Sequence, residues 1–341
     1  DVAVSAPAVV IESATPAVAA VAEGPNPFIA LGLDGALVRA VSDLGYTQPT
    51  EVQAKVIPLA MGSGKADEAS IDLMVSSQTG SGKTAAFLLP VLNTLIAQKA
   101  IEAAAEQAEF ERQRAQAAAS GEAAPKRARR KNPMQSRNFK AAVPGALVLC
   151  PTRELAQQVA QDAIELVKHC KNLRVANVVG GMPYQLQIAK LQNADLVVAT
   201  PGRLLDLQRS LQIKLDKVQF LVVDEADRML DLGFADDLEE VHQMTAQRKQ
   251  TMMFSATFAP RIQQLAMRVM HDGGTNVQII SIAPPQQGHD NFQQKLYWAD
   301  HAQHKRKLLD HWLRDTTINQ AIVFASTQVE CDGLAQDLAE A

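Results

Sequence analysis

Residues 76–84 have the residue types and spacing of a phosphate-binding loop. They follow the apolar run 72–77 and open helical sequence that continues through Phe87. In such a loop, glycines allow a tight turn whose backbone N–H groups and following helix N-terminus surround phosphate oxygens. The lysine reaches the β and γ phosphates of a nucleotide, and the next hydroxyl binds Mg²⁺. The sequence therefore predicts a nucleotide-phosphate site formed by Ser77, Gln78, Thr79, Gly80, Ser81, Gly82, Lys83 and Thr84.

Ser77 stands where the strict pattern has glycine, so a purely structural glycine-rich turn remains an alternative. Two nearby patterns are weaker competitors. Residues 80–85 satisfy the dinucleotide pattern GxGxxA, but that site needs an acidic residue about 20 residues later, at the end of the next strand. The next strand is expected only near Ala146. Residues 62–65 mimic a phosphate loop, but Lys65 is not followed by a hydroxyl residue, so a solvated loop is favoured.

Three carboxylates, Asp224, Glu225 and Asp227, follow an apolar run that ends at Asp224. In a parallel sheet the carboxyl end of this run would lie at the same edge as the phosphate loop. Asp224 could then hold Mg²⁺ through its water shell, and Glu225 could orient and deprotonate an attacking water. Alone, such a cluster is more often a charged helix N-terminus. With the phosphate loop upstream, we predict Glu225, Lys83 and Asp224 as catalytic residues and Thr84 and Asp224 as Mg²⁺ ligands.

Short apolar runs alternate with amphipathic helical stretches from Phe28 onward. This alternation predicts an α/β fold, a parallel sheet with helices on both faces. Residues 146–149 are all apolar, as is typical of a strand buried on both sides. The expected strands are residues 72–77, 146–150, 174–179, 196–200, 220–224 and 251–255.

Composition limits the classes of protein to consider. The 341 residues are 47% hydrophobic, which is enough for more than one domain. The formal net charge of −4 gives no global signal for nucleic acid or membrane, so any polyanion site must be local. Three cysteines without a CxxC pair argue against a disulfide framework or a zinc site and favour the cytoplasm. We expect neither a membrane span nor a signal peptide, because no long uninterrupted apolar run or basic N-terminal segment is present.

The main domain is expected at residues 28–283. Residues 1–27 are rich in Ala, Val and Pro and are predicted to be a disordered tail. Residues 98–144 are an insertion that favours helix but lacks an apolar stripe, so it should stand off the core. Its basic run 126–131 is either a nucleic-acid contact, through counterion release, or a disordered, solubilising loop.

A second, incomplete α/β unit is expected at residues 291–341, after a linker at 284–290. It begins with strand-like residues 292–298, a helix from about Gln303, and strand-like residues 322–325. The chain ends before this unit could close. We assign no site to its histidines, which fit a solvated helix face: His301, His304 and His311.

Asp-Glu-Ala-Asp at residues 224–227 matches the name-giving motif of the DEAD-box ATP-dependent RNA helicases, and the chain resembles the bacterial type of this family from residue 28 to 341. The resemblance implies a RecA-like P-loop domain followed by the start of a truncated second RecA-like domain, whose first motif is similar to residues 323–327. It also implies the cofactors ATP and Mg²⁺, and RNA or ribonucleoprotein partners in the cytoplasm. The implied activity couples RNA-stimulated ATP hydrolysis to local duplex unwinding or to remodelling of RNA–protein complexes.

Residues 45–53 resemble the family's adenine-recognising Q motif, with Phe28 as its upstream aromatic. The resemblance implies that Phe28, Tyr46 and Gln53 contact the base. A side-chain amide can both donate to and accept from an adenine edge, and an aromatic ring can stack on it. Taken singly, Phe28 and Tyr46 fit core aromatics equally well, and Gln53 fits an exposed helix residue.

Further motifs resemble those that hold the RNA backbone and those that couple hydrolysis to unwinding. Arg153 and Arg203 at helix starts would combine guanidinium charge with free backbone amides; a plain helix start is the alternative for residues 151–156. The implied RNA-binding residues are Pro151, Thr152, Arg153, Gly180, Gly181, Thr200, Pro201, Gly202 and Arg203, and the implied coupling residues are Asp227, Ser255 and Thr257.

The sequence departs from the family in three respects. The loop 62–71 and the insertion 98–144 are longer than is usual in the family, and the later motifs of the second domain, with its arginine fingers, are absent from these 341 residues.

Two rival functions are a superfamily 2 motor that acts on DNA and a non-catalytic protein, either an ATP-gated RNA clamp or an assembly scaffold. Gln53 with Phe28 and the Asp-Glu-Ala-Asp motif favour RNA over DNA. The intact phosphate loop and carboxylates argue against a site that cannot hydrolyse ATP.

Overall fold

The computed structural model describes residues 26–62, 71–78, 80–120, 140–282 and 295–340. The chain divides into two compact units, residues 1–284 and 285–341. The predicted linker, Thr79, the basic run 126–131 and most of the predicted tail lie outside the described residues.

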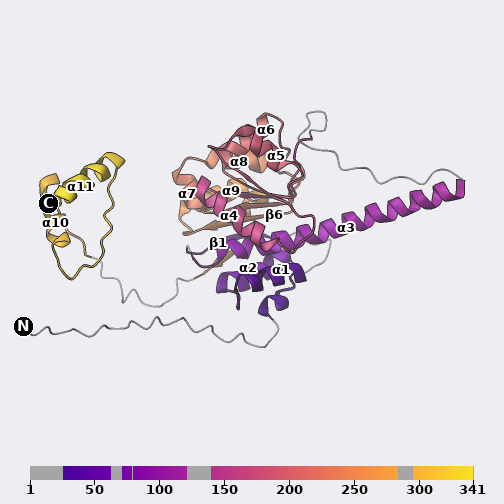
Figure 1. Ribbon diagram of the computed structural model, residues 1–341, viewed down its shortest axis with the longest axis horizontal. Helices are drawn as coiled ribbons and strands as arrows, with labels where there is room; N and C mark the ends of the chain where they lie inside the picture. The colour runs from indigo at the N-terminus through magenta and orange to yellow at the C-terminus, as the bar shows by residue number, and fades with distance from the viewer. Residues whose placement is uncertain (1–25, 63–70, 79, 121–139, 283–294, 341) are drawn as a thin grey trace, which may run out of the picture. The chain divides into compact units, whose positions relative to one another are not determined.

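The first unit contains a seven-stranded sheet with the order β3-β4-β2-β5-β6-β1-β7. All neighbouring strands are parallel (Figure 1). Six strands match the predicted runs to within one or two residues, and β7 is an additional edge strand paired with β1. The strands are β1 (Asp72–Ser76), β2 (Ala146–Leu149), β3 (Val175–Val178), β4 (Leu196–Ala199), β5 (Phe220–Val223), β6 (Gln250–Ser255) and β7 (Val277–Ser281).

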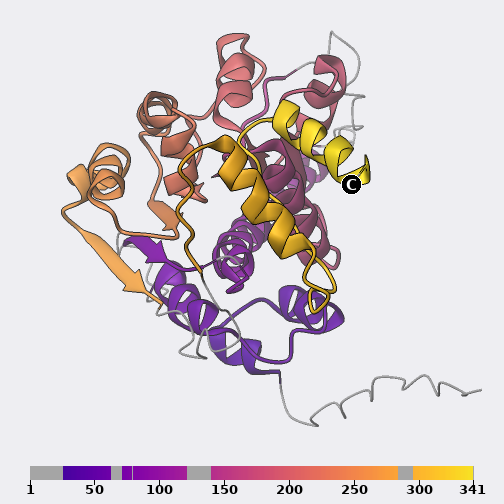
Figure 2. The same ribbon diagram turned by 90° about the vertical axis from the view of Figure 1, so that its left-hand side faces the viewer.

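Helices cover both faces of this sheet (Figures 1 and 2). Alternate strand residues enter different cores: Leu73 and Val75 pack in one hydrophobic cluster, whereas Met74 packs in the other. The predicted α/β class is therefore confirmed. The first face carries α1 (Gly35–Asp43), α2 (Glu51–Met61), α3 (Lys83–Ser120) and α4 (Arg153–Leu166), and the second carries α5 (Tyr184–Leu191), α6 (Pro201–Arg209), α7 (Ala226–Asp231), α8 (Ala235–Met244) and α9 (Pro260–Val269). Two short 3₁₀ helices, η1 (Pro27–Leu31) and η3 (His271–Gly274), precede α1 and follow α9.

Helix α3 has two different halves. Its first turns are buried from Ala85 to Leu92, whereas residues 100–109 are exposed and project away from the sheet (Figure 1). This agrees with an insertion that favours helix without an apolar stripe. By length and composition α3 is the one described helix that could cross a membrane, but half of its most apolar window is buried in the domain, as in the core helix of a packed unit.

The second unit contains α10 (Ala302–Leu313) and α11 (Gln328–Glu340). The helix expected from about Gln303 is therefore present. The two strand-like predictions are wrong for the described residues, because 295–298 and 322–325 form no strand. A strand needs a hydrogen-bonded neighbour, and β propensity alone does not supply one.

A buried polar network lies at the amino-terminal ends of β1 and β6. Asp72 accepts hydrogen bonds from the backbone N–H groups of Thr251, at 2.7 Å, and His271, at 2.8 Å. The buried Arg248 donates to Thr251 Oγ1 at 2.7 Å and to the carbonyl oxygen of Val269 at 2.9 Å. These bonds join β1 and β6 to the segment after α9.

We expect Arg248→Met to lower the free energy of unfolding by about 1–3 kcal/mol, because methionine leaves buried acceptors without donors. Urea unfolding followed by circular dichroism measures the change. Arg268→Met is the matched control: Arg268 pairs with Asp236 and Glu239 at the surface, where water screens the interaction, so the loss should be much smaller. Equal losses in the two variants would contradict the importance of the network.

Candidate functional site: two adjoining clefts

The phosphate loop connects β1 to α3. Ser77 N donates to the carbonyl oxygen of Ser255 at 3.1 Å, which ties the start of the loop to β6. Gly80 and Gly82 have φ angles of 80° and 86°. A Cβ on Gly82 would also lie only 2.7 Å from Gln53 Nε2, so glycine is required at this position. Because α3 begins at Lys83, the loop ends at free helix N–H groups suited to phosphate oxygens.

Lys83 contacts two carboxylates at the end of β5. Its Nζ lies 3.1 Å from Asp224 Oδ1 and 3.5 Å from Glu225 Oε1. Burial raises the pKa of Asp224, whereas the ammonium of Lys83 acts in the opposite direction. The structure thus brings the three predicted catalytic side chains together.

Glu225 has an unusual backbone. It is the N-cap of α7 with φ 51° and ψ 53°, in the left-handed region that non-glycine residues rarely adopt. Its side chain is 16% exposed and lies 3.5 Å from Lys83 and 3.6 Å from Arg228 Nη1. Strained residues of this kind cluster at functional sites, and the strain here directs a carboxylate into the cleft described below.

Three buried oxygens at this site have no hydrogen-bond partner among the described residues: Ser77 Oγ, Ser81 Oγ and Asp224 Oδ2. Unpartnered buried polar atoms are rare in folded proteins and can mark the place of a ligand. Mg²⁺ takes oxygen ligands and usually keeps several waters, so Asp224 and the hydroxyl of Thr84 fit the predicted metal site. Within the described ranges, no cluster of three or more His, Cys, Asp or Glu forms a site that would hold a metal by protein ligands alone.

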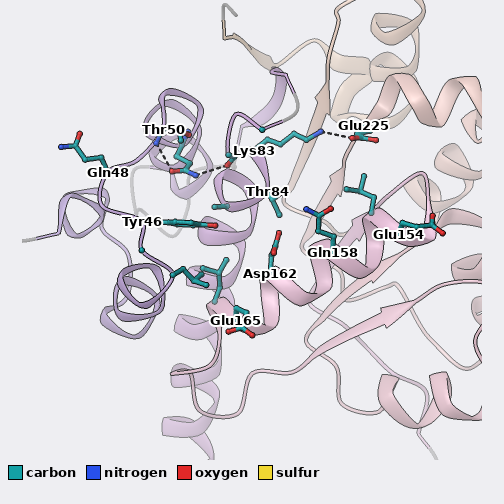
Figure 3. Close-up of a pocket in the computed structure, with 18 of the residues that line it drawn as sticks. Tyr46, Gln48, Thr50, Lys83, Thr84, Glu154, Gln158, Asp162, Glu165 and Glu225 are labelled. Carbon is teal, nitrogen blue, oxygen red and sulfur yellow. Dashed lines mark hydrogen bonds and ion pairs between the residues drawn. The ribbon is translucent and has the colours of Figure 1, made fainter. Parts of the chain in front are cut away.

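Lys83, Thr84 and Glu225 line a cleft of about 930 Å³ (Figure 3). Ser77, Ser81 and Asp224 are not among its lining residues. One wall comes from the phosphate loop and the start of α3, the second from residues 44–53, and the third from one face of α4. Tyr46 is 41% exposed and its ring lies in the cleft. The predicted nucleotide residues in the lining are Tyr46, Gln53, Gly80, Gly82, Lys83 and Thr84, together with Glu225.

Gln53 connects two walls of the cleft. Its Oε1 accepts from Thr50 N at 3.0 Å, completing a capping box at the start of α2, and its Nε2 donates to the carbonyl oxygen of Gly82 at 3.1 Å. The residue is only 4% exposed. The exposed-helix alternative is therefore wrong, and the amide is positioned by the phosphate loop as well as by its own helix.

Gln53→Ala should remove the preference for ATP over GTP and weaken ATP binding by about 1–3 kcal/mol, because hydrogen bonds to a buried base and to the loop are lost. Calorimetric titration with both nucleotides measures this. Gln48→Ala is the control, since Gln48 is an exposed amide at the rim of the same cleft (Figure 3). If the ratio of ATP to GTP affinity were unchanged in Gln53→Ala, Gln53 would not recognise the base.

Phe28 is not in the cleft. Its side chain is fully buried in the core formed by α1 to α4, and it is not among the residues that line the cleft. The N-cap Asn26 fixes the turn of η1 by accepting from Phe28 N at 3.0 Å. The Phe28 ring could contact a base only by leaving this core. The stacking of Phe28 on a base therefore stays a prediction.

A second cleft of about 430 Å³ adjoins the first at the start of α4, since Thr152 and Glu154 line both. It contains the helix starts at Arg153 and Arg203. Gly181 and Pro201 adjoin this lining without being part of it. The lining includes the predicted RNA-binding residues Pro151, Thr152, Arg153, Gly180, Thr200, Gly202 and Arg203.

The predicted coupling residues lie at or shortly after the carboxyl ends of the neighbouring strands β5 and β6. Ser255 is buried, and its Oγ accepts from Thr257 N at 3.4 Å. Ser76 Oγ at the end of β1 donates to the carbonyl oxygen of Ala256 at 3.2 Å. The Ser-Ala-Thr segment is thereby attached to the strand that enters the phosphate loop; Asp227 lies on α7 with its side chain half-buried.

Several lining residues are not predicted from the sequence. Gln158, Asp162 and Glu165 line the first cleft, named the nucleotide cleft below after the phosphate loop in its wall. Burial raises the pKa of Asp162. Their spacing from Glu154 is that of one helix face, which is the signal that could identify them. Phe234, the N-cap of α8, lines the second cleft, and no local pattern indicates it.

Residues 50–265 match the family model of the DEAD/DEAH box helicases. The chain belongs to this family. Curated DEAD-box relatives match most of it. It is 36% identical to the ATP-dependent RNA helicase SrmB of Escherichia coli over 92% of this chain and 60% of the relative. It is 31% identical to the RNA helicase CrhR of Synechocystis over 93% of this chain and 53% of the relative. The chain thus spans little more than half the length of these relatives.

Solved DEAD-box structures share the fold. The chain superposes on Saccharomyces cerevisiae Dbp5 bound to RNA and ADP BeF3 with a TM-score of 0.65, 26% identity, and coverage of 93% of this chain and 67% of that chain. A DEAD box protein from Methanococcus jannaschii gives a TM-score of 0.54 and 28% identity over 92% of this chain and 70% of that chain.

Proposed function

We propose that this protein is an RNA-stimulated ATPase that couples ATP hydrolysis to local unwinding of RNA duplexes or remodelling of RNA–protein complexes. The observation that carries the proposal is the junction of the two clefts. Thr152 and Glu154 at the start of α4 line both the nucleotide cleft and the cleft with Arg153 and Arg203. A nucleic-acid strand in the second cleft would therefore lie against an element that also forms a wall of the first.

The nucleotide cleft can supply the chemistry of phosphoryl transfer to water. Lys83 and the helix N-terminus would bind the β and γ phosphates. Glu225, held in the cleft by its left-handed backbone, would orient the attacking water and accept its proton. Asp224 and Thr84 would hold Mg²⁺, which when bound neutralises charge on the phosphates.

The second cleft suits a nucleic-acid backbone. Arg153 and Arg203 carry guanidinium groups that match phosphate geometry, and both lie in the first turn of a helix, where backbone amides attract anions. Backbone contacts of this kind position a strand without reading its sequence. We infer an RNA strand from the names of the relatives and from the RNA bound to the yeast structure.

The predicted setting of this activity is the cytoplasm. The spacing of the chain's three cysteines, Cys150, Cys170 and Cys331, which form no CxxC pair, supports this setting.

ATP hydrolysis measured with RNA and with DNA of one sequence, in the full-length protein, tests the proposal. We expect RNA to stimulate turnover and DNA to do so much less. Greater stimulation by DNA would identify a DNA motor instead. Turnover at background with saturating RNA would identify an ATP-gated RNA clamp.

A further inference from the structure

A glycine turn separates β3 from α5 beside the second cleft. Gly181 has φ 80°, and a Cβ at this position would clash with Nη1 of Arg153. The guanidinium of Arg153 therefore lies in the space left by the missing side chain. The direction in which the Arg153 side chain points therefore depends on the backbone conformation of this turn.

One buried side chain holds both ends of the turn. Gln187 Nε2 donates to the carbonyl oxygen of Val179 at 2.6 Å and to that of Met182 at 3.3 Å. These two carbonyls bracket Gly180 and Gly181. Gln187 is fully buried, and its hydrogen bond to Val179 is also buried and so shielded from competing water.

Helix geometry explains why this position can act on the turn. α5 begins at Tyr184 after the N-cap Pro183, which makes no side-chain cap. Side chains on a helix lean toward its N-terminus, so Gln187 in the first turn reaches back over the glycines. Only its donor group is used, because its Oε1 is buried without a hydrogen-bond partner among the described residues.

We propose that Gln187 is a positioning residue for RNA binding: its amide clamps the Gly180-Gly181 turn, and the turn in turn holds Arg153 in the second cleft. This role rests on the proposed function. Gln187 does not line either cleft, so it acts through the turn and through Arg153. The nucleotide cleft should not depend on it.

Two variants of similar length remove the donor. Gln187→Met has no polar group, and Gln187→Glu places acceptor oxygens against two carbonyls. We expect RNA affinity to fall about 5- to 50-fold in each, as the loss of buried hydrogen bonds implies, with ATP affinity unchanged. The RNA concentration for half-maximal ATPase stimulation should rise by a similar factor, with little change in the maximal rate.

Gln192→Met is the matched control. Gln192 caps the other end of α5, is also buried, and its Nε2 has no partner among the described residues. The same substitution there removes a buried amide that does not hold the turn, so RNA affinity should stay near that of the wild type.

Fluorescence anisotropy with a labelled single-stranded RNA, and calorimetry with ATP, measure both affinities in the full-length protein. An RNA affinity within twofold of wild type in either Gln187 variant overturns the role. So does an equal fall in RNA and ATP affinity, which would indicate general destabilisation, or an equal effect of Gln192→Met. If the wild type bound no RNA, the proposed function itself would fail.

Discussion

Glu225→Gln should lower the rate of ATP hydrolysis by about 10²–10⁴ while leaving ATP affinity nearly unchanged. Glutamine has almost the shape of glutamate, but its amide cannot accept the proton of the attacking water. The backbone of Glu225 supports this role, since a left-handed N-cap directs its carboxylate to within 3.5 Å of Lys83.

Single-turnover hydrolysis and calorimetric ATP binding separate these two effects. Glu165→Gln is the control, because it makes the same chemical change at another residue of the same cleft, on α4 (Figure 3). It should hydrolyse ATP at close to the wild-type rate. A Glu225→Gln variant with normal hydrolysis would show that another group activates the water.

Lys83→Ala should instead weaken ATP binding itself, by about 2–5 kcal/mol, as is typical when one partner of a buried charge pair in a binding site is truncated. The change removes the charge opposite the β and γ phosphates and also leaves the fully buried Asp224 without its partner at 3.1 Å. Burial already raises the pKa of Asp224. Loss of the ammonium should raise this pKa further, so that Asp224 holds a metal less well at neutral pH.

Calorimetric titration with ATP measures this loss. Lys55→Ala is the control, because Lys55 is an exposed lysine on α2 that pairs with Glu51 and does not line the cleft. The two catalytic variants must also differ from each other. If Glu225→Gln lost as much ATP affinity as Lys83→Ala, the separate roles assigned to the base and to the phosphate-binding lysine would be wrong.

The sheet could be predicted where strands are buried on both faces. β2, β4 and β5 are four-residue apolar runs with every residue buried, so composition alone indicates them. β7 could not be predicted in this way. It is an edge strand with Gln278 and Ile279 exposed, held by pairing with β1. The pairing that defines it is a tertiary contact between distant parts of the chain.

The phosphate loop and the carboxylates could be predicted because their chemistry depends on short local spacing. Gln187 could not, since a single glutamine in helical sequence gives no local sign of burial or of the turn that it holds. Phe28 is a residue for which the sequence predicts a cleft contact that this structure does not contain. Its sequence position matches a family aromatic, yet apolar packing places it in the core of this structure.

Strand separation of a short RNA duplex by the full-length protein tests the central claim most directly. The account predicts repeated separation with ATP, little without nucleotide, and much less with ATP when Glu225→Gln blocks turnover. Separation that is equally fast without ATP, or none with ATP and Mg²⁺ at saturating protein, would contradict the assignment of this protein as an ATP-dependent RNA helicase.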